Sequence, residues 1–247
     1  AVELMNVGSN YLREHVIDKT RIHYAVDTGN FPPNIVPDRA NSWYFVRAPR
    51  MGDVKNIMER IKKIAEGAAL MTETQEEFVL DCGCYEFKEN NAFSDLTYEN
   101  LLEAEKPEYT AEEIEFAQNL QKTLNPDFLL KEKKALNIDE AMHQGVCERN
   151  LWKSYELNGS SDSGDVSQII PSCLYTTACW PIGVLPHTWQ ATAANGSSLG
   201  KKGALYSAKV CAGIVFDLMT KPELLEKITK EFNDRKEKED YEPLYSE

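Results

Sequence analysis

Residues 53–71, DVKNIMERIKKIAEGAALM, constrain the fold more than any other stretch, because they predict a long amphipathic helix. Apolar side chains recur at the three- and four-residue spacing of one helix face. They form one stripe of seven residues: Val54, Ile57, Met58, Ile61, Ile64, Ala65 and Ala68. Such a stripe has to be buried against another element. A helix that packs on a sheet is therefore expected in this part of the chain.

Two stretches before this helix have the alternation of half-buried strands. In TRIHYAVDTG, Ile22, Tyr24 and Val26 alternate with more polar residues, which is the pattern of a strand with one buried face. NSWYFVRAP is rich in aromatic and β-branched residues, which favour strands. His23 lies on the polar face of the first strand. The loop between them, NFPPNIVPDRA, is stiffened by its prolines.

Residues 1–88 are expected to form one small domain. In the opening stretch AVELMNVGSNYLREHV, helical spacing relates Leu4, Val7, Gly8, Tyr11, Leu12, His15 and Val16, which predicts an amphipathic helix, and TQEEFVLDCGCYEF predicts a third strand. The order helix, strand, strand, helix, strand is typical of an α+β layer and resembles a ferredoxin-like unit without its first strand. Because the first helix has no cap before it, we expect the chain to be a piece of a longer protein.

Residues 89–247 are expected to form a second region of the α/β class. The polar stretch ENNAFSDLTYEN is interpreted as a loop at the boundary, and Thr110 with Glu113 predicts a capping box at the start of a helix over 110–124. QIIPSCLYTTACW predicts a buried strand. A long helix is expected over 199–219, and another from Pro222.

Charge and composition exclude some classes of protein. The net charge of −13 argues against a nucleic-acid partner, since there is no cationic face to neutralise phosphates. No apolar run approaches the ~20 residues that span a bilayer, so no membrane association is expected. The six cysteines form no CxxC pair, which indicates reduced thiols in a cytoplasmic protein.

His187, in GVLPHTWQ, is the histidine that most invites a functional interpretation. It lies in a loop after the predicted strand, where α/β folds place active sites. Asp162 and Asp165 in GSSDSGDVS could join it around a divalent cation. The alternatives are a surface histidine and a turn whose aspartates cap backbone amides. Local spacing alone leaves these alternatives open.

Other chemistries have weaker support. There is no GxSxG motif for a serine hydrolase, and Cys173 and Cys179 lie in an apolar stretch, where thiols are usually inert. Lys201 and Lys202 stand in the first turn of a predicted helix, a position that the helix dipole disfavours for cations. They are either solvated lysines or lie near an anion.

Several long motifs together resemble one known family. RIHYAVDTGNFPPNIVPDRANSWYFVRAP, IAEGAALMTET, GSSDSGDVS, GVLPHTWQ and SSLGKKGALYSAKV occur in the order found in the group formed by the B-type subunit of aminobenzoyl-glutamate hydrolase. That group is part of the aminoacylase and carboxypeptidase-like metallopeptidases. The resemblance covers most of the chain and weakens over 90–157 and in the last twenty residues.

The resemblance implies a fold with a lid and a catalytic domain. Residues 1–88 match the lid, a ferredoxin-like dimerisation domain, and residues 89–247 match the last part of a catalytic domain that holds two divalent metals, zinc or manganese. It further implies a homodimer formed through the lid. The motifs for the other metal ligands and for the glutamate base have no counterpart here, so a companion N-terminal segment or subunit is expected.

The resemblance also assigns roles to individual residues. His187 matches a metal ligand, and His23 matches a lid histidine that reaches the scissile carbonyl across the dimer. Asn34 matches a residue that binds the substrate carboxylate, and Asp162 and Asp165 match a loop near the metals. The chain departs from the group's pattern at Gln168 and Lys201, which puts the substrate pocket in question.

The implied function is metal-dependent hydrolysis of the amide bond of N-acyl or N-aroyl amino acids, p-aminobenzoyl-glutamate-like compounds or small peptides. The chain alone is expected to be inactive. The alternative is a non-catalytic dimerisation or interaction fragment of such an enzyme.

Overall fold

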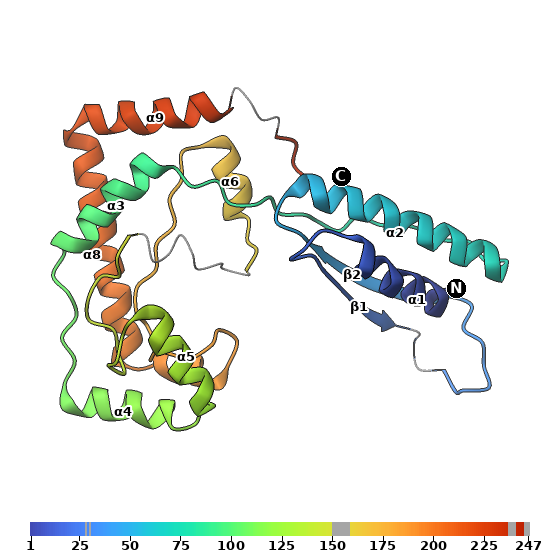
Figure 1. Ribbon diagram of the computed structural model, residues 1–247, viewed down its shortest axis with the longest axis horizontal. Coiled ribbons are helices and arrows are strands. Elements are labelled where there is room, and N and C mark those ends of the chain that lie inside the picture. The colour runs from blue at the N-terminus through green and yellow to red at the C-terminus, as the bar shows by residue number, and fades with distance from the viewer. Residues whose placement is uncertain (28, 30, 150–158, 237–240, 245–247) are drawn as a thin grey trace. The chain divides into compact units, whose positions relative to one another are not determined.

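The computed structural model describes residues 1–27, 29, 31–149, 159–236 and 241–244. These residues divide into two compact units. The first unit contains residues 1–87 together with 160–166 and the segment from Tyr241, and the second contains the remainder. The elements are helices and a small two-stranded sheet (Figure 1), so the expected mixture of helix and strand is confirmed.

The first unit is built on an antiparallel pair of strands, β1 (Arg21–Asp27) and β2 (Asn41–Arg47). Two helices, α1 (Val2–Leu12) and α2 (Met51–Thr72), contact the sheet, and a short 3-10 turn, Arg13–His15, follows α1 (Figure 1). The core that joins them consists of Leu12, Ile22, Ile57 and Ile61. The predicted strands and the predicted long helix are therefore confirmed.

The buried face of α1 differs from the predicted one. Leu4 is 40% exposed and Tyr11 73% exposed, whereas Asn6 and Ser9 are buried. The Tyr44 hydroxyl of β2 donates a hydrogen bond of 2.6 Å to Asn6 Oδ1. A polar contact therefore joins the helix to the sheet. Of the apolar side chains in the predicted stripe, Leu12 is buried in the core, whereas Leu4, Val7 and Tyr11 are exposed.

The third strand, predicted over 74–87, is wrong. After α2 ends, the chain has no ladder beyond an isolated bridge at Cys82, and Val79 is 72% exposed. A segment of strand-forming residues needs a partner edge and a core, and residues 75–81 have neither among the described residues. Residues 83–85 instead bind the segment 241–244, because Gly83 N donates to Leu244 O at 2.7 Å and the Tyr85 hydroxyl donates to Glu242 O at 2.8 Å.

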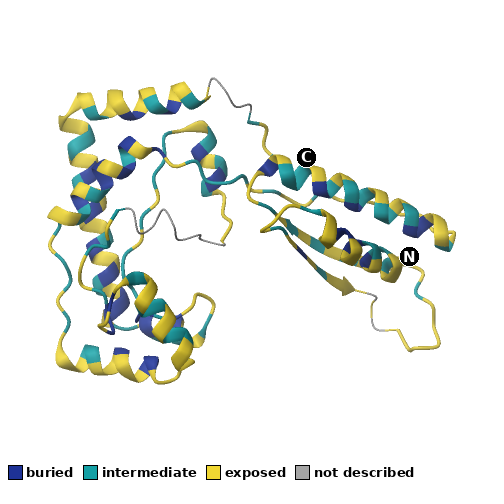
Figure 2. Cartoon of the chain, viewed as in Figure 1, coloured by how far each residue is buried: buried dark blue, intermediate teal, exposed yellow. Residues whose placement is uncertain are grey.

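The second unit is helical in its described part. Its helices are α3 (Asn91–Glu103), α4 (Ala111–Gln121), α5 (Pro126–Leu136), α7 (Trp189–Asn195), α8 (Ser198–Thr220) and α9 (Pro222–Lys236), while α6 (Ser163–Ile169) crosses the division between the units. The largest core joins α3, α8 and α9: Ala92, Leu96, Tyr206, Val210, Ile214 and Ile228. Buried positions recur along α2 and α8 between exposed ones (Figure 2). The predicted helices over 110–124 and 199–219 and from Pro222 are confirmed, as is the capping box of α4.

The loop predicted at ENNAFSDLTYEN is a helix. The side chain of Asn90 caps α3 by accepting a 3.0 Å hydrogen bond from Phe93 N. The buried face of α3 includes Ser94, Thr97 and Asn100, and the Asn100 amide donates to Asp217 at 3.0 Å. Because polar residues occupy buried positions, the apolar periodicity that identifies a helix is weak here.

The buried strand predicted over 168–180 is also wrong. Residues up to Ile169 belong to α6, and the rest run without a strand ladder. This segment lies on α8, where the Thr177 hydroxyl donates to Gly203 O at 3.0 Å. A Cβ at Gly203 would lie 2.4 Å from Ala178 O. Close backbone contact with a helix, not strand pairing, explains the apolar composition.

Within the described residues, α8 is long and apolar enough to cross a membrane, by length and composition only. This finding differs from the expectation that no run approaches that length. One face of α8 packs in the core of the second unit, and Phe216 and Met219 on the helix are exposed. A single helix of this kind does not assign the chain to a membrane.

Candidate functional site

His187 is an exposed side chain on a left-handed backbone position. Its φ is +63°, which costs about 1 kcal/mol or more for a residue other than glycine. Lys19, Glu73 and Asn137 also have positive φ. Lys19 lies in a turn before β1, and Glu73 and Asn137 end helices, where that conformation is common. His187 instead precedes the N-terminus of α7.

The residues before His187 hold its loop in place. Ile182 N donates to Ala141 O at 3.0 Å, and the side-chain amide of Gln121 donates to Ile182 O at 2.9 Å. Gly183 has a φ of +86°, and a Cβ there would lie 2.8 Å from Leu129 Cδ1. The base of the loop is therefore fixed on α4 and α5.

The residues after His187 form a helix cap. Thr188 Oγ1 accepts a 3.3 Å hydrogen bond from Ala191 N and donates one of 2.8 Å to Leu185 O. Trp189 is 60% exposed. The imidazole is thus presented to solvent between two anchored segments, beside an exposed indole. The prediction that His187 lies in a loop immediately before a helix is confirmed.

His23 lies on the exposed face of the sheet, as predicted. It faces Phe45 across the β1–β2 pair. Phe45 and Trp43 are half exposed, and their ring centroids lie 5.0 Å apart. Arg21 and Arg47 form the next pair on this face. The face therefore combines an imidazole, two neighbouring aromatic rings inclined at 52° and two guanidinium groups.

Trp43, Phe45, Arg21 and Arg47 were missed as candidate binding residues by sequence reasoning. The signal was present, because the register that places His23 outward also places large aromatic residues outward on the neighbouring strand. An exposed aromatic pair is informative, since large apolar side chains are normally buried.

Asn34 is exposed in the loop between the strands. Ile35 N donates to Pro32 O at 2.9 Å, which makes a tight turn around Asn34. Val36 beside it is 89% exposed. The side chain of Asn34 is accessible to a ligand, and its role in binding stays a prediction.

Asp165 has a structural role within the first unit. Its Oδ2 accepts from Tyr85 N at 3.2 Å and its Oδ1 accepts from the Tyr241 hydroxyl at 3.0 Å. Burial and the neighbouring Asp165 raise the pKa of the Cys84 thiol. Asp162 is exposed and accepts from Val166 N through its carbonyl. The GSSDSGD motif thus includes the first turn of α6 and the contacts that hold residue 85.

Lys202 has an internal anionic partner. Its Nζ lies 2.7 Å from Glu113 Oε2 and donates to Glu108 O at 2.7 Å. The hydrogen bonds from Lys202, Ser198 and the Thr110 backbone lower the pKa of Glu113 to about 2. Glu113 is therefore an anion beside one of the two lysines, as one of the two sequence alternatives predicted.

The predicted site residues fall into different units. His23, Asn34, Asp162 and Asp165 belong to the first unit and His187 belongs to the second. Within the described residues, no group of three or more His, Cys, Asp and Glu side chains could hold a metal ion. The described side chains therefore do not by themselves complete a metal centre.

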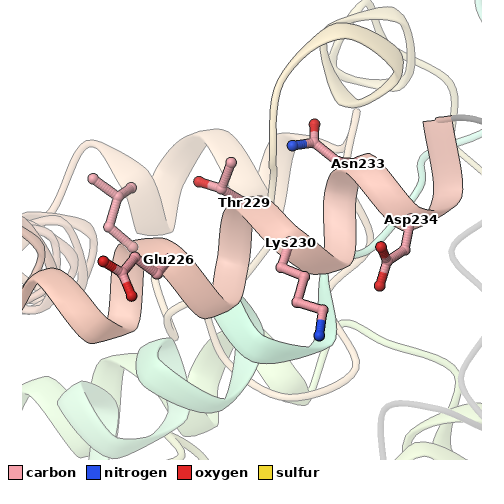
Figure 3. Close-up of a pocket in the computed structure, with 6 residues that line it drawn as sticks. Glu226, Thr229, Lys230, Asn233 and Asp234 are labelled. Atoms are coloured by element: carbon pink, nitrogen blue, oxygen red, sulfur yellow. The ribbon is translucent and has the colours of Figure 1, made fainter.

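A shallow surface hollow lies on α9. It is lined by Leu225, Glu226, Thr229, Lys230, Asn233 and Asp234 (Figure 3). All six residues come from one helix, and Glu226, Lys230 and Asp234 give the hollow charges of both signs. The hollow contains none of the predicted site residues.

Comparison with known proteins places the chain among relatives of amide-bond hydrolases. Over 94% of its length it is 34% identical to the B-type subunit of p-aminobenzoyl-glutamate hydrolase from Escherichia coli (strain K12). It is 26% and 24% identical to the Xaa-Arg dipeptidases of Mus musculus and Homo sapiens, over 94% and 93% of its length. The resemblance to the aminobenzoyl-glutamate hydrolase group is confirmed.

The chain spans about half the length of these relatives, with 51% of the bacterial protein and 45% and 44% of the mammalian ones covered. No family model matches the chain.

Proposed function

We propose that the chain is part of a metal-dependent amidohydrolase that cleaves N-acyl or N-aroyl amino acids, p-aminobenzoyl-glutamate-like compounds or small peptides. The observation that carries the proposal is the 34% identity over 94% of the chain to the bacterial p-aminobenzoyl-glutamate hydrolase protein. The two dipeptidase relatives support an amide as the bond that is broken.

His187 would supply one metal ligand. Its exposure and its anchored, left-handed loop support this role, because imidazole is a common ligand for zinc and also suits other transition metals. We expect zinc, with manganese as the alternative. The bound metal would supply an activated water for hydrolysis. The remaining ligands and the general base would come from a companion N-terminal segment or subunit, so the chain alone would be inactive.

His23 would act on the substrate. An imidazole N–H can donate to a carbonyl oxygen that becomes anionic, a contact worth about 3–4 kcal/mol in other enzymes. In a homodimer formed through residues 1–88, the lid domain, His23 would serve the partner subunit. Trp43 and Phe45 beside it would offer an aromatic surface to an aroyl group.

Asn34 and the two aspartates would contact the polar groups of the substrate. The Asn34 amide can donate to a carboxylate, and its exposure supports this role. Of the two aspartates, Asp162 is the exposed one and Asp165 is bonded to Tyr85 and Tyr241. We place the complete protein in the cytoplasm, with neither a membrane nor a nucleic acid as partner.

The test is His187→Ala in the complete protein, together with any companion segment or subunit. The expected result is loss of one bound metal per subunit and a loss of amide hydrolysis of at least a hundredfold. His15→Ala, an exposed histidine on the 3-10 turn after α1, is the matched control and should leave both unchanged. Unchanged metal content and hydrolysis in His187→Ala would refute the assignment.

The second candidate is a non-catalytic dimerisation or interaction fragment. It is favoured by the described side chains, which gather no metal-binding group of three. Mass spectrometry of the isolated chain tests the second candidate. Stoichiometric, tightly bound zinc would contradict the second candidate, since one histidine with two aspartates should hold zinc poorly.

A further inference from the structure

Glu140, His143 and Cys147, here called the thiol cluster, lie outside every site discussed above. Cys147 Sγ lies 3.7 Å from His143 Nε2. His143 Nδ1 lies 3.6 Å from Glu140 Oε1. A nucleophile on one ring nitrogen and a carboxylate beside the other is the order that activates a nucleophile through a histidine base.

The orientation of the imidazole follows from its neighbours. His143 Nδ1 is buried and has no hydrogen-bond partner among the described residues, and Glu140 presents a carboxylate just beyond hydrogen-bond distance. A carboxylate on that side favours the tautomer that carries the proton on Nδ1. The lone pair of Nε2 then faces the thiol and can accept its proton.

Both ends of the segment are anchored. Ala141 and Met142 are buried in the core with Ala117 and Leu199. After Cys147, Arg149 pairs with Asp95 of α3 at 2.5 Å. The thiol and the imidazole are therefore held on a short loop that is fixed before and after them.

Gly145 leaves room for the ring. A Cβ at this position would lie 3.1 Å from His143 Cε1 and 3.4 Å from Nε2. Any side chain here would press on the imidazole edge that faces Cys147. The loop sequence is thus compatible with the cluster, and it offers a way to displace the ring without removing it.

The cluster is accessible from solvent. Cys147 is partly exposed, and the side chains of His143 and Glu140 are 22% and 48% exposed. A small reagent can therefore reach the sulfur. Cys173, by contrast, has its pKa raised by burial, which makes it the less reactive kind of thiol.

We propose that Cys147 is a reactive thiol that takes soft electrophiles, either an alkylating carbon or a disulfide sulfur, with His143 as its proton acceptor and Glu140 orienting the ring. With iodoacetamide, the thiol proton moves to His143 Nε2 and a bond forms between Sγ and the methylene carbon. The carbon–iodine bond breaks, and its electron pair leaves with iodide. With a disulfide, a bond forms between Sγ and one sulfur, the original sulfur–sulfur bond breaks, and the second sulfur leaves with its electron pair as a thiolate.

The test measures the rate of iodoacetamide alkylation of each cysteine by peptide mass spectrometry between pH 5.5 and 9.5. Cys211 on α8, an exposed thiol, is the reference in the same molecule. An ordinary thiol loses about tenfold in thiolate for each pH unit below its pKa of ~8.5. The rate profile of Cys147 should have its midpoint at least one pH unit below that of Cys211.

Two substitutions separate activation from folding. His143→Gln should raise the midpoint of Cys147 to that of Cys211, and Gly145→Val should raise it part of the way while retaining the histidine. Both should leave the profile of Cys211 unchanged and should leave the partly buried Cys173 as slow to react as in the unaltered chain, since unfolding would expose that thiol. A Cys147 profile that coincides with that of Cys211 in the unaltered chain, or that is insensitive to His143→Gln, would overturn the proposal.

Discussion

Lys202 on α8 and Glu113 on α4 form an ion pair of 2.7 Å, and Glu113 is also the acidic residue of the α4 capping box. Glu113 accepts from its own helix cap, Thr110 N, at 2.8 Å. One carboxylate therefore caps a helix and binds a second helix at the same time. The charge state of Glu113 should therefore affect how the free energy of unfolding of the second unit changes at low pH.

Lys202→Met should weaken the second unit and change its pH dependence. The pKa of Glu113 is about 2 in the folded protein and ~4.3 in an unfolded chain. The stabilisation is therefore fully present above pH ~4.3 and is lost as the pH falls towards 2. After allowance for solvent screening, we expect a loss of about 1 kcal/mol at pH 7. The measurement is urea unfolding at pH 3 and pH 7.

The neighbouring Lys201→Met is the control, because Lys201 is exposed one position earlier on the same helix turn. It should unfold like the unaltered chain at both pH values. Equal effects of the two substitutions would contradict the role of the Glu113 pair.

Gly164→Ala should destabilise the first unit strongly. A Cβ at this position would lie 1.8 Å from Tyr85 O, a backbone atom that cannot rotate away. We expect a loss of about 3 kcal/mol or more, the range of severe steric substitutions. Gly67→Ala on α2 meets nothing within 4 Å and should stabilise by about 0.5–1 kcal/mol. Thermal unfolding followed by circular dichroism measures both, and a mild effect at 164 would disprove the close contact.

His187→Gly should be more stable than His187→Ala, although both remove the imidazole. The left-handed backbone at 187, with φ of +63°, is tolerated by glycine and strained for alanine, a difference of about 1 kcal/mol. Chemical unfolding of the two variants tests this, and a more stable alanine variant would show that the loop is not held in that conformation. In the complete protein, both should lose hydrolysis to the same extent.

His23→Gln should leave stability within about 0.5 kcal/mol, because the side chain is on the solvent face. In the complete protein, it should lower kcat for amide hydrolysis by about a hundredfold or more, the effect of losing one oxyanion donor. His15→Gln should change neither quantity. If both variants retained full kcat, His23 would have no part in the reaction.

The sequence predicted best those elements whose apolar pattern matches their burial. The stripe of α2 and the alternation of Ile22 and Tyr24 on β1 led to the correct helix and strand, since a regular core contact imposes a regular period. The capping box of Thr110 was also predictable, because it depends on two nearby side chains.

The failures share a physical cause. α1 and α3 bury Asn6 and Asn100, which bind partners far away in sequence. Residues 171–180 look like a strand because they lie on α8, where Thr177 bonds to the helix backbone. Local periodicity carries no information about such partners. The outward position of His23 was predictable from strand register, whereas the bonds of Asp165 to Tyr85 and Tyr241 were not.

The contacts of Tyr85 and Gly83 with residues 241–244 imply an order of assembly. A hydrogen bond between residues 157 positions apart, from Tyr85 to Glu242, can form only after the ribosome has made almost all of the second unit. The sheet, α1 and α2 emerge before the second unit, whereas residues 241–244, which bind Gly83 and Tyr85, emerge after it. A nascent chain halted after the second unit has begun would carry a first unit without its contacts to residues 241–244. We expect chaperone binding or protease cleavage to concentrate at this stage.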